Sequence, residues 1–161
     1  MWVRVEFESY DREAHVVHVR SSVGSFSAVW KGRDEPLPGG GAYVEFTTGP
    51  TAVWGIDVIE ASADEPDSIF QDEDGWTFIG TILGRGPDQA RYERTGRIIP
   101  DHDLRDGICY LQVNDADTIM MDTDRLDPTA AGRRFRVRQT EVQLFPFDTF
   151  GYTVSGTEWS V

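Results

Sequence analysis

Apolar and polar residues alternate with a period of two along most of the chain. Segment 3–9 (VRVEFES) places valine and phenylalanine side chains on one face and charged side chains on the other, and segment 24–31 (GSFSAVWK) continues the alternation. Because successive side chains of a β-strand point to opposite faces, this pattern predicts half-buried strands. The same reasoning predicts further strands at 43–46, 51–59, 76–83, 109–113, 118–123 and 135–138.

Clusters of turn-forming residues separate the predicted strands. They read GRDEPLPGGG, TTGPT, DEDG and GRGPD, and Gly, Pro and Asp are residues that tolerate the backbone angles of turns. No stretch carries a helical stripe longer than about two turns. The best helical candidates are RYERTGRII and the segment around 62–70. The chain is therefore predicted to be all-β.

Two similar stretches predict a two-unit organisation. At an offset of 67 residues, segment 43–57 lies over segment 110–124, and each has the pattern of a hairpin. We predict an N-terminal unit at 1–59, an acidic connector or contact loop at 60–74 and a C-terminal unit at 75–161. The alternative is one β-sandwich that is built from the same strands, with 60–74 as an insertion.

The second unit resembles a small OB-like barrel. The residues that carry this resemblance are a strand opened by Gly132 and an alternating run that ends in LFPF (144–147). The first unit looks similar, with FSAVWKG, a PLPGGG turn, AYVEF and AVWGIDV in the corresponding positions. The resemblance implies two consecutive small OB-like or SH3-like barrels, and OB-like barrels bind oligonucleotides, sugars or proteins.

The chain is acidic, and the acidity is concentrated in its first half. The formal net charge is −13, of which residues 1–74 contribute −10 (15 acidic against 5 basic) and residues 75–161 contribute −3 (13 against 10). Such a field favours a basic partner and opposes nucleic acid. Apolar runs are short and the N-terminus is charged, so neither a membrane span nor a signal peptide is expected. A single cysteine, Cys109, is typical of a reducing cytoplasm.

The stretch DADTIMMDTD (115–124) sets four aspartates around a short apolar run. Calcium takes about six or more oxygen ligands from one tight loop that has a central glycine and a late glutamate, and this stretch has neither. We interpret it as a strand between two acidic turns. His15 and His18 are expected on opposite faces of a strand, and His102 lies in a polar turn (PDHD). No metal site and no cofactor are therefore predicted.

No motif for a catalytic nucleophile is complete either. VGSFS (23–27) lacks the spacing of a nucleophile elbow. Cys109 shares a strand face with Leu111 and Val113, where a buried, inert thiol is expected. PLPGGG leads into a strand, so it lacks the helix N-terminus that phosphate-binding loops use. The chain is predicted not to be an enzyme, although dispersed acids that assemble in three dimensions stay open as an alternative.

Segment 60–75 (EASADEPDSIFQDEDG) combines seven acidic residues with two large apolar ones. One interpretation is a solvated linker between the two units. The other is a contact loop in which apolar anchors are ringed by charge, as in electrostatically steered interfaces. On the second interpretation the partner-binding residues are Asp64, Glu65, Asp67, Ile69, Phe70, Asp72, Glu73 and Asp74.

Segment 132–139 (GRRFRVRQ) is the basic counterpart. Arg134, Arg136 and Arg138 share one face of a predicted strand, and the apolar parity changes after it, so a bend is expected near 139–140. Three arginines in a row can follow the phosphates of an oligonucleotide. They can equally pair with carboxylates of neighbouring strands, which this acidic chain has in excess.

These observations favour a non-catalytic, cytoplasmic protein-binding module of inhibitor, immunity or adaptor type, with an acidic surface that contacts a basic protein. One alternative is an OB-like protein that binds oligonucleotides or small ligands through the arginine strand. The other is an enzyme with a dispersed acidic site. Nucleic acid is the less favoured partner because the net charge of −13 opposes it.

Overall fold

β-strands form nearly all of the regular structure. The computed structural model describes residues 2–83, 107–125, 127–150, 153–154 and 157–158, in which the helical content is one short 3₁₀ turn, η1 (Pro128–Ala130). The all-β class predicted from the alternation is confirmed. The helical candidate RYERTGRII and His102 lie outside the described residues. Within the described part, no helix is long and apolar enough to cross a membrane.

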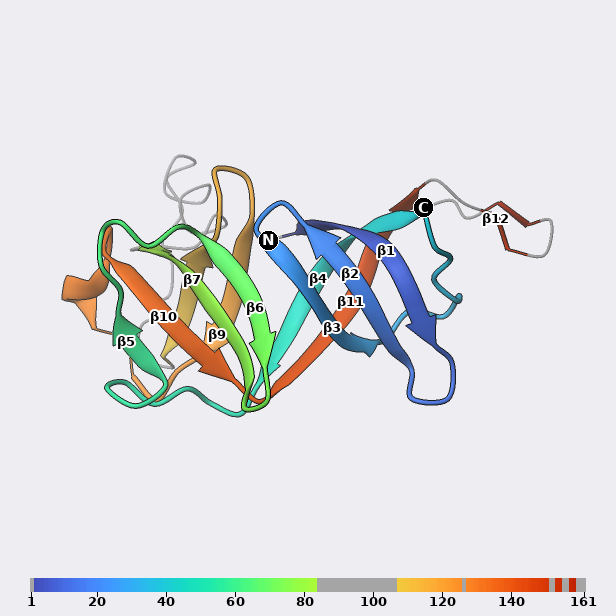
Figure 1. Ribbon diagram of the computed structural model, residues 1–161. Coiled ribbons are helices and arrows are strands. Elements are labelled where there is room, and N and C mark those ends of the chain that lie inside the picture. The colour runs from blue at the N-terminus through green and yellow to red at the C-terminus, as the bar shows by residue number, and fades with distance from the viewer. Residues whose placement is uncertain (1, 84–106, 126, 151–152, 155–156, 159–161) are drawn as a thin grey trace, which may run out of the picture.

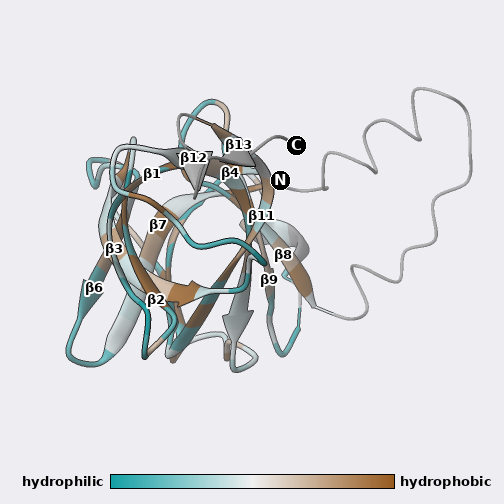
Figure 2. Cartoon of the chain, turned by 90° about the vertical axis from the view of Figure 1, so that its right-hand side faces the viewer, coloured by the Kyte–Doolittle hydropathy of each residue, from teal (hydrophilic) through white to brown (hydrophobic). Residues whose placement is uncertain are grey.

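Five strands close into a small barrel, seen on the right of Figure 1. In barrel order they are β1 (Val3–Asp11), β2 (Val16–Ser21), β3 (Gly24–Trp30), β11 (Glu141–Phe150) and β4 (Gly41–Gly49). All neighbours are antiparallel except β3 and β11, which are parallel. Figure 2 looks onto this end of the molecule, where hydrophobic and hydrophilic segments share the same strands. The alternation therefore lines the barrel with apolar side chains.

The other strands form a second, six-stranded sheet on the left of Figure 1. β7 (Gly75–Leu83) is central and pairs with β10 (Arg134–Gln139), β6 (Ser68–Asp72) and β8 (Ile108–Gln112). β5 (Val58–Glu60) and β9 (Thr118–Asp122) lie at the two ends. The predicted strand at 51–59 is reduced to bridges at Ala52 and Trp54 before β5. Since Ala52 bonds Asp122 and Asp124 at 2.8 Å each, it links the two ends of this sheet.

The two sheets do not follow one another along the chain. β11 comes from the range 75–161, yet it closes the barrel of the first half, where it pairs with β4 along its whole length. The expected bend is present, because β10 ends at Gln139 and β11 begins at Glu141. The run ending in LFPF thus closes the first barrel, whereas the sequence assigned it to the second. β12 (Thr153–Val154) and β13 (Thr157–Glu158) form a separate short ribbon.

Segment 60–74 is part of the folded sheet structure. β6 lies within it, pairs with β7 and approaches β3 of the barrel: Ile69 N donates to Val23 O at 3.1 Å. A Cβ placed on Gly24 (φ 149°) would lie 2.1 Å from Ile69 O, so the close approach of the two strands requires glycine there. This segment therefore joins the two sheets through backbone contacts.

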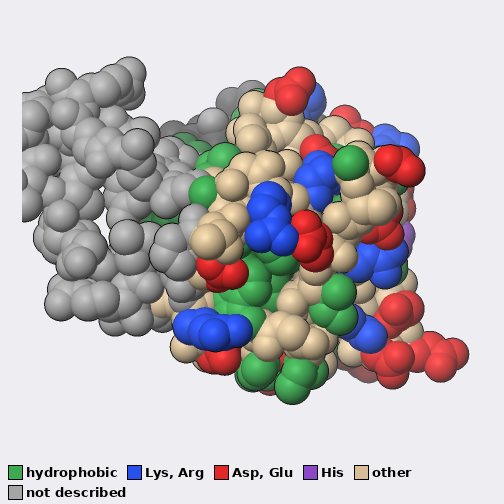
Figure 3. Space-filling model, turned by 90° about the vertical axis from the view of Figure 1, so that its left-hand side faces the viewer, with side chains coloured by type: hydrophobic (Ala, Val, Ile, Leu, Met, Phe, Trp, Pro, Cys, Tyr) green, Lys and Arg blue, Asp and Glu red, His purple; other side chains and the backbone are tan. Residues whose placement is uncertain are grey.

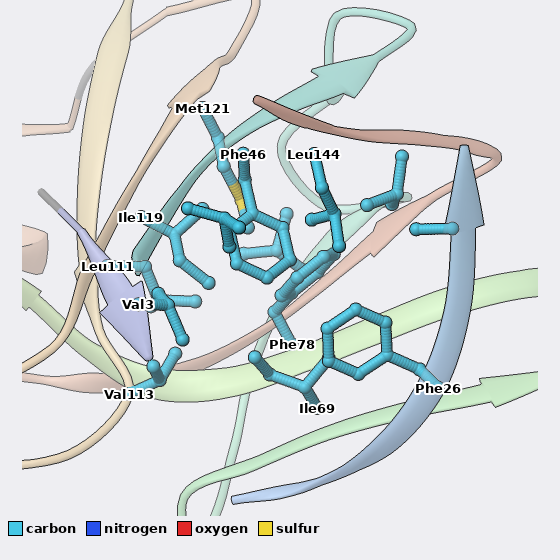
Figure 4. Packing of buried hydrophobic residues seen from close by; sticks show 14 of the residues in the cluster. Val3, Phe26, Phe46, Ile69, Phe78, Leu111, Val113, Ile119, Met121 and Leu144 are labelled. Carbon is cyan, nitrogen blue, oxygen red and sulfur yellow. The ribbon is translucent and has the colours of Figure 1, made fainter. Parts of the chain in front are cut away.

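Side chains of the second sheet also satisfy the exposed backbone of β3. The amide of Ser27 donates to Gln71 Oε1 at 2.9 Å, and Trp76 Nε1 donates to Ser27 O at 2.8 Å. Beneath these bonds the buried apolar residues of both sheets form one cluster, in which Phe26, Ile69 and Phe78 meet (Figure 4). The two sheets share a core at this junction.

Candidate functional site

The two charged surfaces that the sequence singled out face each other. β10 lies between β5 and β7 in the second sheet. The acidic segment 60–74 runs along the face of that sheet on which the arginines of β10 lie. Four arginines of this region form ion pairs with acids of that segment, an arrangement called the arginine–carboxylate ladder below. Its members are Arg133, Arg134, Arg136 and Arg138 with Glu60, Glu65, Asp67, Asp72 and Asp74.

Arg134 is the best-anchored arginine of the ladder. Its side chain is 20% exposed, and Nη1 lies 2.7 Å from Asp67 Oδ1. Nη2 donates to the backbone oxygen of Glu65 at 2.6 Å, and Nη1 reaches Thr81 Oγ1 at 3.3 Å. Because a guanidinium presents several fixed donors, it ties the loop before β6 to the sheet. Arg138, by contrast, is 45% exposed and lies 3.7–3.8 Å from Asp74 and Asp72.

The other two arginines of the ladder, Arg133 and Arg136, are in direct contact with their carboxylates. Arg136 binds the carboxylate of Glu65, and Arg133 donates to both oxygens of Glu60, at 2.5 and 3.2 Å. The hydrogen bond from Arg136 is the main reason why the pKa of Glu65 lies below its ordinary value. The hydrogen bonds that Arg133 donates to Glu60 raise the pKa of Arg133. In the sequence, the acidic segment is a candidate site for a basic protein and the arginine strand is a candidate site for an oligonucleotide. In the structure, most of these charges pair with each other.

The remaining predicted contact residues are placed differently from one another. Ile69 is fully buried, so its side chain packs in the core and does not project as an anchor. Phe70, next along β6, is 38% exposed. Asp64 and Glu73 are exposed and form no ion pair with any residue that the structure describes. Only part of the predicted contact loop is therefore free at the surface.

A second surface, which the sequence did not single out, lies on the outside of the barrel. Trp2 and Phe147 stack with their ring centroids 4.0 Å apart, and the exposed fractions of these side chains are 38% and 55%. Tyr43 on β4 and Phe145 on β11 are exposed to similar extents, 40% and 38%. Large aromatic side chains gathered on one outer face are unusual, because exposed apolar groups are normally scattered.

Acidic side chains lie among these rings. Phe145 is directly opposite Glu45 in the antiparallel pair of β11 and β4, so both point outward. A hollow of about 70 Å³ lies between Glu45, Met120 of β9 and Asp122. Glu141, at the start of β11, is also exposed. We call this surface the aromatic–acidic face; its members are Trp2, Tyr43, Phe145 and Phe147 with Glu45, Asp122 and Glu141.

The acids of the aromatic–acidic face differ from those of the ladder. Among the described residues, none forms an ion pair with Glu45, Asp122 or Glu141.

The sequence carries a signal for the rings of this face. Val142 and Leu144 point inward, so Phe145 has the outward parity of β11. Phe147 follows a register shift at Pro146, which keeps it exposed. The parity of the strand therefore predicts that the rings of Phe145 and Phe147 point away from the core.

The far end of the second sheet presents another apolar patch. Figure 3 shows hydrophobic side chains in the middle of this end, with basic and acidic side chains around them. Ile56 and Ile59 are exposed there at 70% and 49%. Trp54 is held by an edge contact with Phe135 at 5.2 Å and by a bond from its amide to Asp124 Oδ1 at 3.0 Å. These bonds make Trp54 a structural residue that closes the sheet end.

The residues considered for metal or nucleophilic chemistry have structural surroundings. In the ranges that the structure describes, no three His, Cys, Asp or Glu side chains are grouped so that they could hold a metal ion. Residues 118–122 form β9, and Asn114 accepts backbone bonds from Ala116 and Asp117 in the turn before it. The strand predicted within DADTIMMDTD is confirmed as β9, with an acidic turn before it. Burial raises the pKa of the Cys109 thiol to about 12, which keeps it protonated.

Comparison with protein-family models, with curated proteins and with solved structures finds no match for this chain.

Proposed function

We propose that this protein is a protein-binding module of inhibitor, immunity or adaptor type, and that it binds a basic protein through the aromatic–acidic face. The observation that carries the proposal is the combination of four exposed aromatic rings with acids that no described residue neutralises. Aromatic anchors supply most of the binding energy at protein interfaces, and surrounding charge raises the association rate.

The overall charge supports a basic partner. The chain carries a formal net charge of −13, whereas the ladder arginines are engaged with carboxylates inside the molecule. A basic protein would be attracted over distances of about a Debye length, roughly 8–10 Å at physiological salt. The association rate would then fall as the ionic strength rises.

The strand order of the barrel supports the OB-like resemblance. If β11 is counted as the fifth strand, it lies between the third and fourth, as in a five-stranded Greek-key barrel. The second sheet is then an insertion between strands four and five, which differs from two barrels in tandem. OB-like barrels bind several classes of ligand, so the class of partner is argued from the face and not from the barrel.

The same geometry disfavours the oligonucleotide alternative. Arg134, Arg136 and Arg138 each lie within ion-pair distance of a carboxylate, and a phosphate would have to displace that carboxylate. A single-stranded nucleic acid could also bind by stacking its bases on the exposed aromatic rings. On this face Arg4 lies opposite Tyr43, but Glu45 lies directly opposite Phe145, and its negative charge opposes a phosphate there.

Affinity capture from an extract of the source cells tests the proposal. The baits are the wild type, a face variant (Tyr43→Ser, Phe145→Ser, Phe147→Ser) and a ladder variant (Glu65→Gln, Asp72→Asn). We expect one basic protein to be retained by the wild type and by the ladder variant, and lost by the face variant. Retention of a nucleic acid, or of an acidic protein, would contradict the proposal.

A further inference from the structure

Three outward-facing side chains form a row across the first three strands of the barrel. Glu8 is on β1, His18 on β2 and Ser27 on β3. His18 and Ser27 are directly opposite in the β2–β3 pair, and a register shift between Phe7 and Ser9 brings Glu8 beside His18. The His18 Nδ1 atom lies 2.8 Å from Ser27 Oγ, and Nε2 lies 3.0 Å from Glu8 Oε2.

The tautomer of His18 follows from its two neighbours. An ionised carboxylate only accepts hydrogen bonds, so Nε2 of the neutral ring carries the proton and donates to Glu8. Nδ1 is then an acceptor, and the Ser27 hydroxyl donates to it. Glu8 is itself held by a second contact, since its Oε1 lies 4.0 Å from Arg20 Nη1. The row has the order nucleophile, base and orienting carboxylate that characterises serine hydrolases.

A hydrogen-bond donor is available beside Ser27. The backbone N–H of Ser27 donates a hydrogen bond to the side-chain amide of Gln71 at 2.9 Å. Because only the oxygen of that amide can accept a hydrogen bond, the atom in contact is Oε1. The amide nitrogen of Gln71 therefore lies on the other arm of the same group, and no described residue accepts a bond from it. A side-chain amide in this position can stabilise the negative oxygen of a tetrahedral intermediate.

Space for a substrate continues along the same outer face. Glu6 and Arg20 are the next outward pair along β1 and β2, and they line a hollow of about 280 Å³ together with Arg4, Ser21, Ser22 and Asp117. The hollow begins at the pair next to the row, and Glu8, His18 and Ser27 do not line it. The side chain of His18 is 40% exposed, so the row itself is open to solvent. The hollow offers room for the part of a substrate away from the reacting bond.

We propose that Ser27, His18 and Glu8 form an acyl-transfer site that hydrolyses small carboxylic esters. Ser27 Oγ attacks the ester carbonyl carbon while its proton moves to His18 Nδ1. The carbon–oxygen bond to the alcohol breaks, and the alcohol leaves with that proton, so the acyl group stays on Ser27. Water then attacks the acyl group and gives a proton to His18 Nδ1, which returns it to Ser27 as the carboxylic acid leaves. Glu8 and Gln71 undergo no covalent change.

This activity is independent of binding through the aromatic–acidic face. The row lies on β1, β2 and β3, whereas the aromatic–acidic face is built mainly on β4 and β11. Failure of either proposal leaves the other standing. The sequence did not indicate the row because its three members are about nine residues apart along the chain (Glu8, His18, Ser27), and only strand pairing brings them together.

A fluorophosphonate probe tests the proposal on the full chain. The probe is attacked by an activated serine, which displaces fluoride and leaves a stable adduct whose mass and position can be read by mass spectrometry. We expect a single adduct on Ser27. Labelling should be slower by at least about 10²-fold in His18→Ala, which keeps the serine but lacks the base. Glu8→Gln should slow it to a smaller extent.

Ser25 provides a matched control. It is exposed on the same face of β3, two residues before Ser27, but it is opposite Arg20 and has no histidine partner among the described residues. Ser25→Ala should label at the wild-type rate, and Ser27→Ala should not label. Release of p-nitrophenol from p-nitrophenyl acetate should follow the same order. Labelling of the wild type no faster than of Ser27→Ala, or an adduct on another residue, would overturn the proposal; mapping on the wild type needs no variant to fold.

Discussion

The arginine–carboxylate ladder and the aromatic–acidic face are both rich in charge, but their charges have different partners. In the ladder each of four arginines meets an acid of segment 60–74 within the same chain. On the aromatic–acidic face, Glu45, Asp122 and Glu141 have no such partner among the described residues, and the exposed ring of Phe145 lies beside Glu45. Local charge density is therefore a poor guide to an interface unless the pairing is known.

The same contrast separates stability from binding. Charges that are paired inside the molecule hold β6 and its preceding loop on the sheet, so their removal should change the free energy of unfolding. The rings of the aromatic–acidic face lie outside the buried core and are 38–55% exposed, so their removal should leave the fold intact and change association.

The largest effect is expected from cutting the chain. A fragment of residues 1–66 lacks β11, so β4 keeps only β1 as a neighbour, β3 loses its parallel partner, and the barrel stays open. Open strand edges and an exposed apolar lining should make this fragment insoluble or unfolded alone. Circular dichroism and gel filtration of fragments 1–66 and 75–161, separately and mixed, check this. A folded, monomeric 1–66 fragment would support instead the predicted independent units, 1–59 and 75–161.

Adjacent residues of β6 should differ sharply in their effect on stability. Ile69 is fully buried where the two sheets meet, and Ile69→Ala should lower the free energy of unfolding by about 2–5 kcal/mol. Phe70 is 38% exposed, and Phe70→Ala should cost about 1 kcal/mol or less. Urea unfolding of both variants measures the difference. Equal effects would mean that segment 60–74 does not pack as a strand.

Within the ladder, Arg134 should matter more than Arg138. Arg134→Gln removes three contacts and leaves Asp67 partly buried without its cation, which should cost about 2 kcal/mol. Arg138→Gln removes two contacts at 3.7–3.8 Å from a half-exposed side chain, and should change stability by about 0.5 kcal/mol or less. Thermal unfolding at equal ionic strength compares them. A larger loss in Arg138→Gln would contradict the geometry of the ladder.

The smallest effect concerns pH. The pKa of Glu65 is lowered in the folded protein, mainly by its hydrogen bond from Arg136, so this pair stabilises the fold at pH values above the ordinary value of 4.5. The contribution is lost as the pH falls through the lowered folded pKa. The Tm of the wild type should exceed that of Glu65→Gln at pH 7, and the gap should close toward pH 3. A gap of the same size at pH 3 and at pH 7 would contradict this role of Glu65.

Much of the fold could be predicted from alternation alone, because side-chain parity reports which face of a strand is buried. Val3, Val5 and Phe26 are all buried as their parity requires. The partner of each strand could not be predicted, since pairing depends on contacts distant in sequence. For this reason the sequence pattern places β11 in the sheet of the second half, and the contact-loop interpretation places Ile69 at the surface although β3 and β7 cover it.

The candidate sites show the same limit. Arg134, Arg136 and Arg138 do share a strand face, and their possible pairing with carboxylates was foreseeable from the acidic composition. Which acids they meet depends on the path of 60–74 over β10, and no local pattern encodes that path. Phe145 and Phe147 carried a signal in their outward parity, but their proximity to Trp2 needs β1, β4 and β11 to be neighbours.

The most direct test of the central claim is the affinity of the purified complex between this protein and the basic partner recovered by capture. Surface plasmon resonance at physiological salt would compare the wild type with the face variant (Tyr43→Ser, Phe145→Ser, Phe147→Ser) and the ladder variant (Glu65→Gln, Asp72→Asn). We predict a Kd about 10²-fold or more weaker for the face variant, as expected for the loss of aromatic anchors, and a change of about threefold or less for the ladder variant. Strong binding by the face variant together with lost binding by the ladder variant would contradict binding through the aromatic–acidic face. It would indicate instead that the partner contacts segment 60–74.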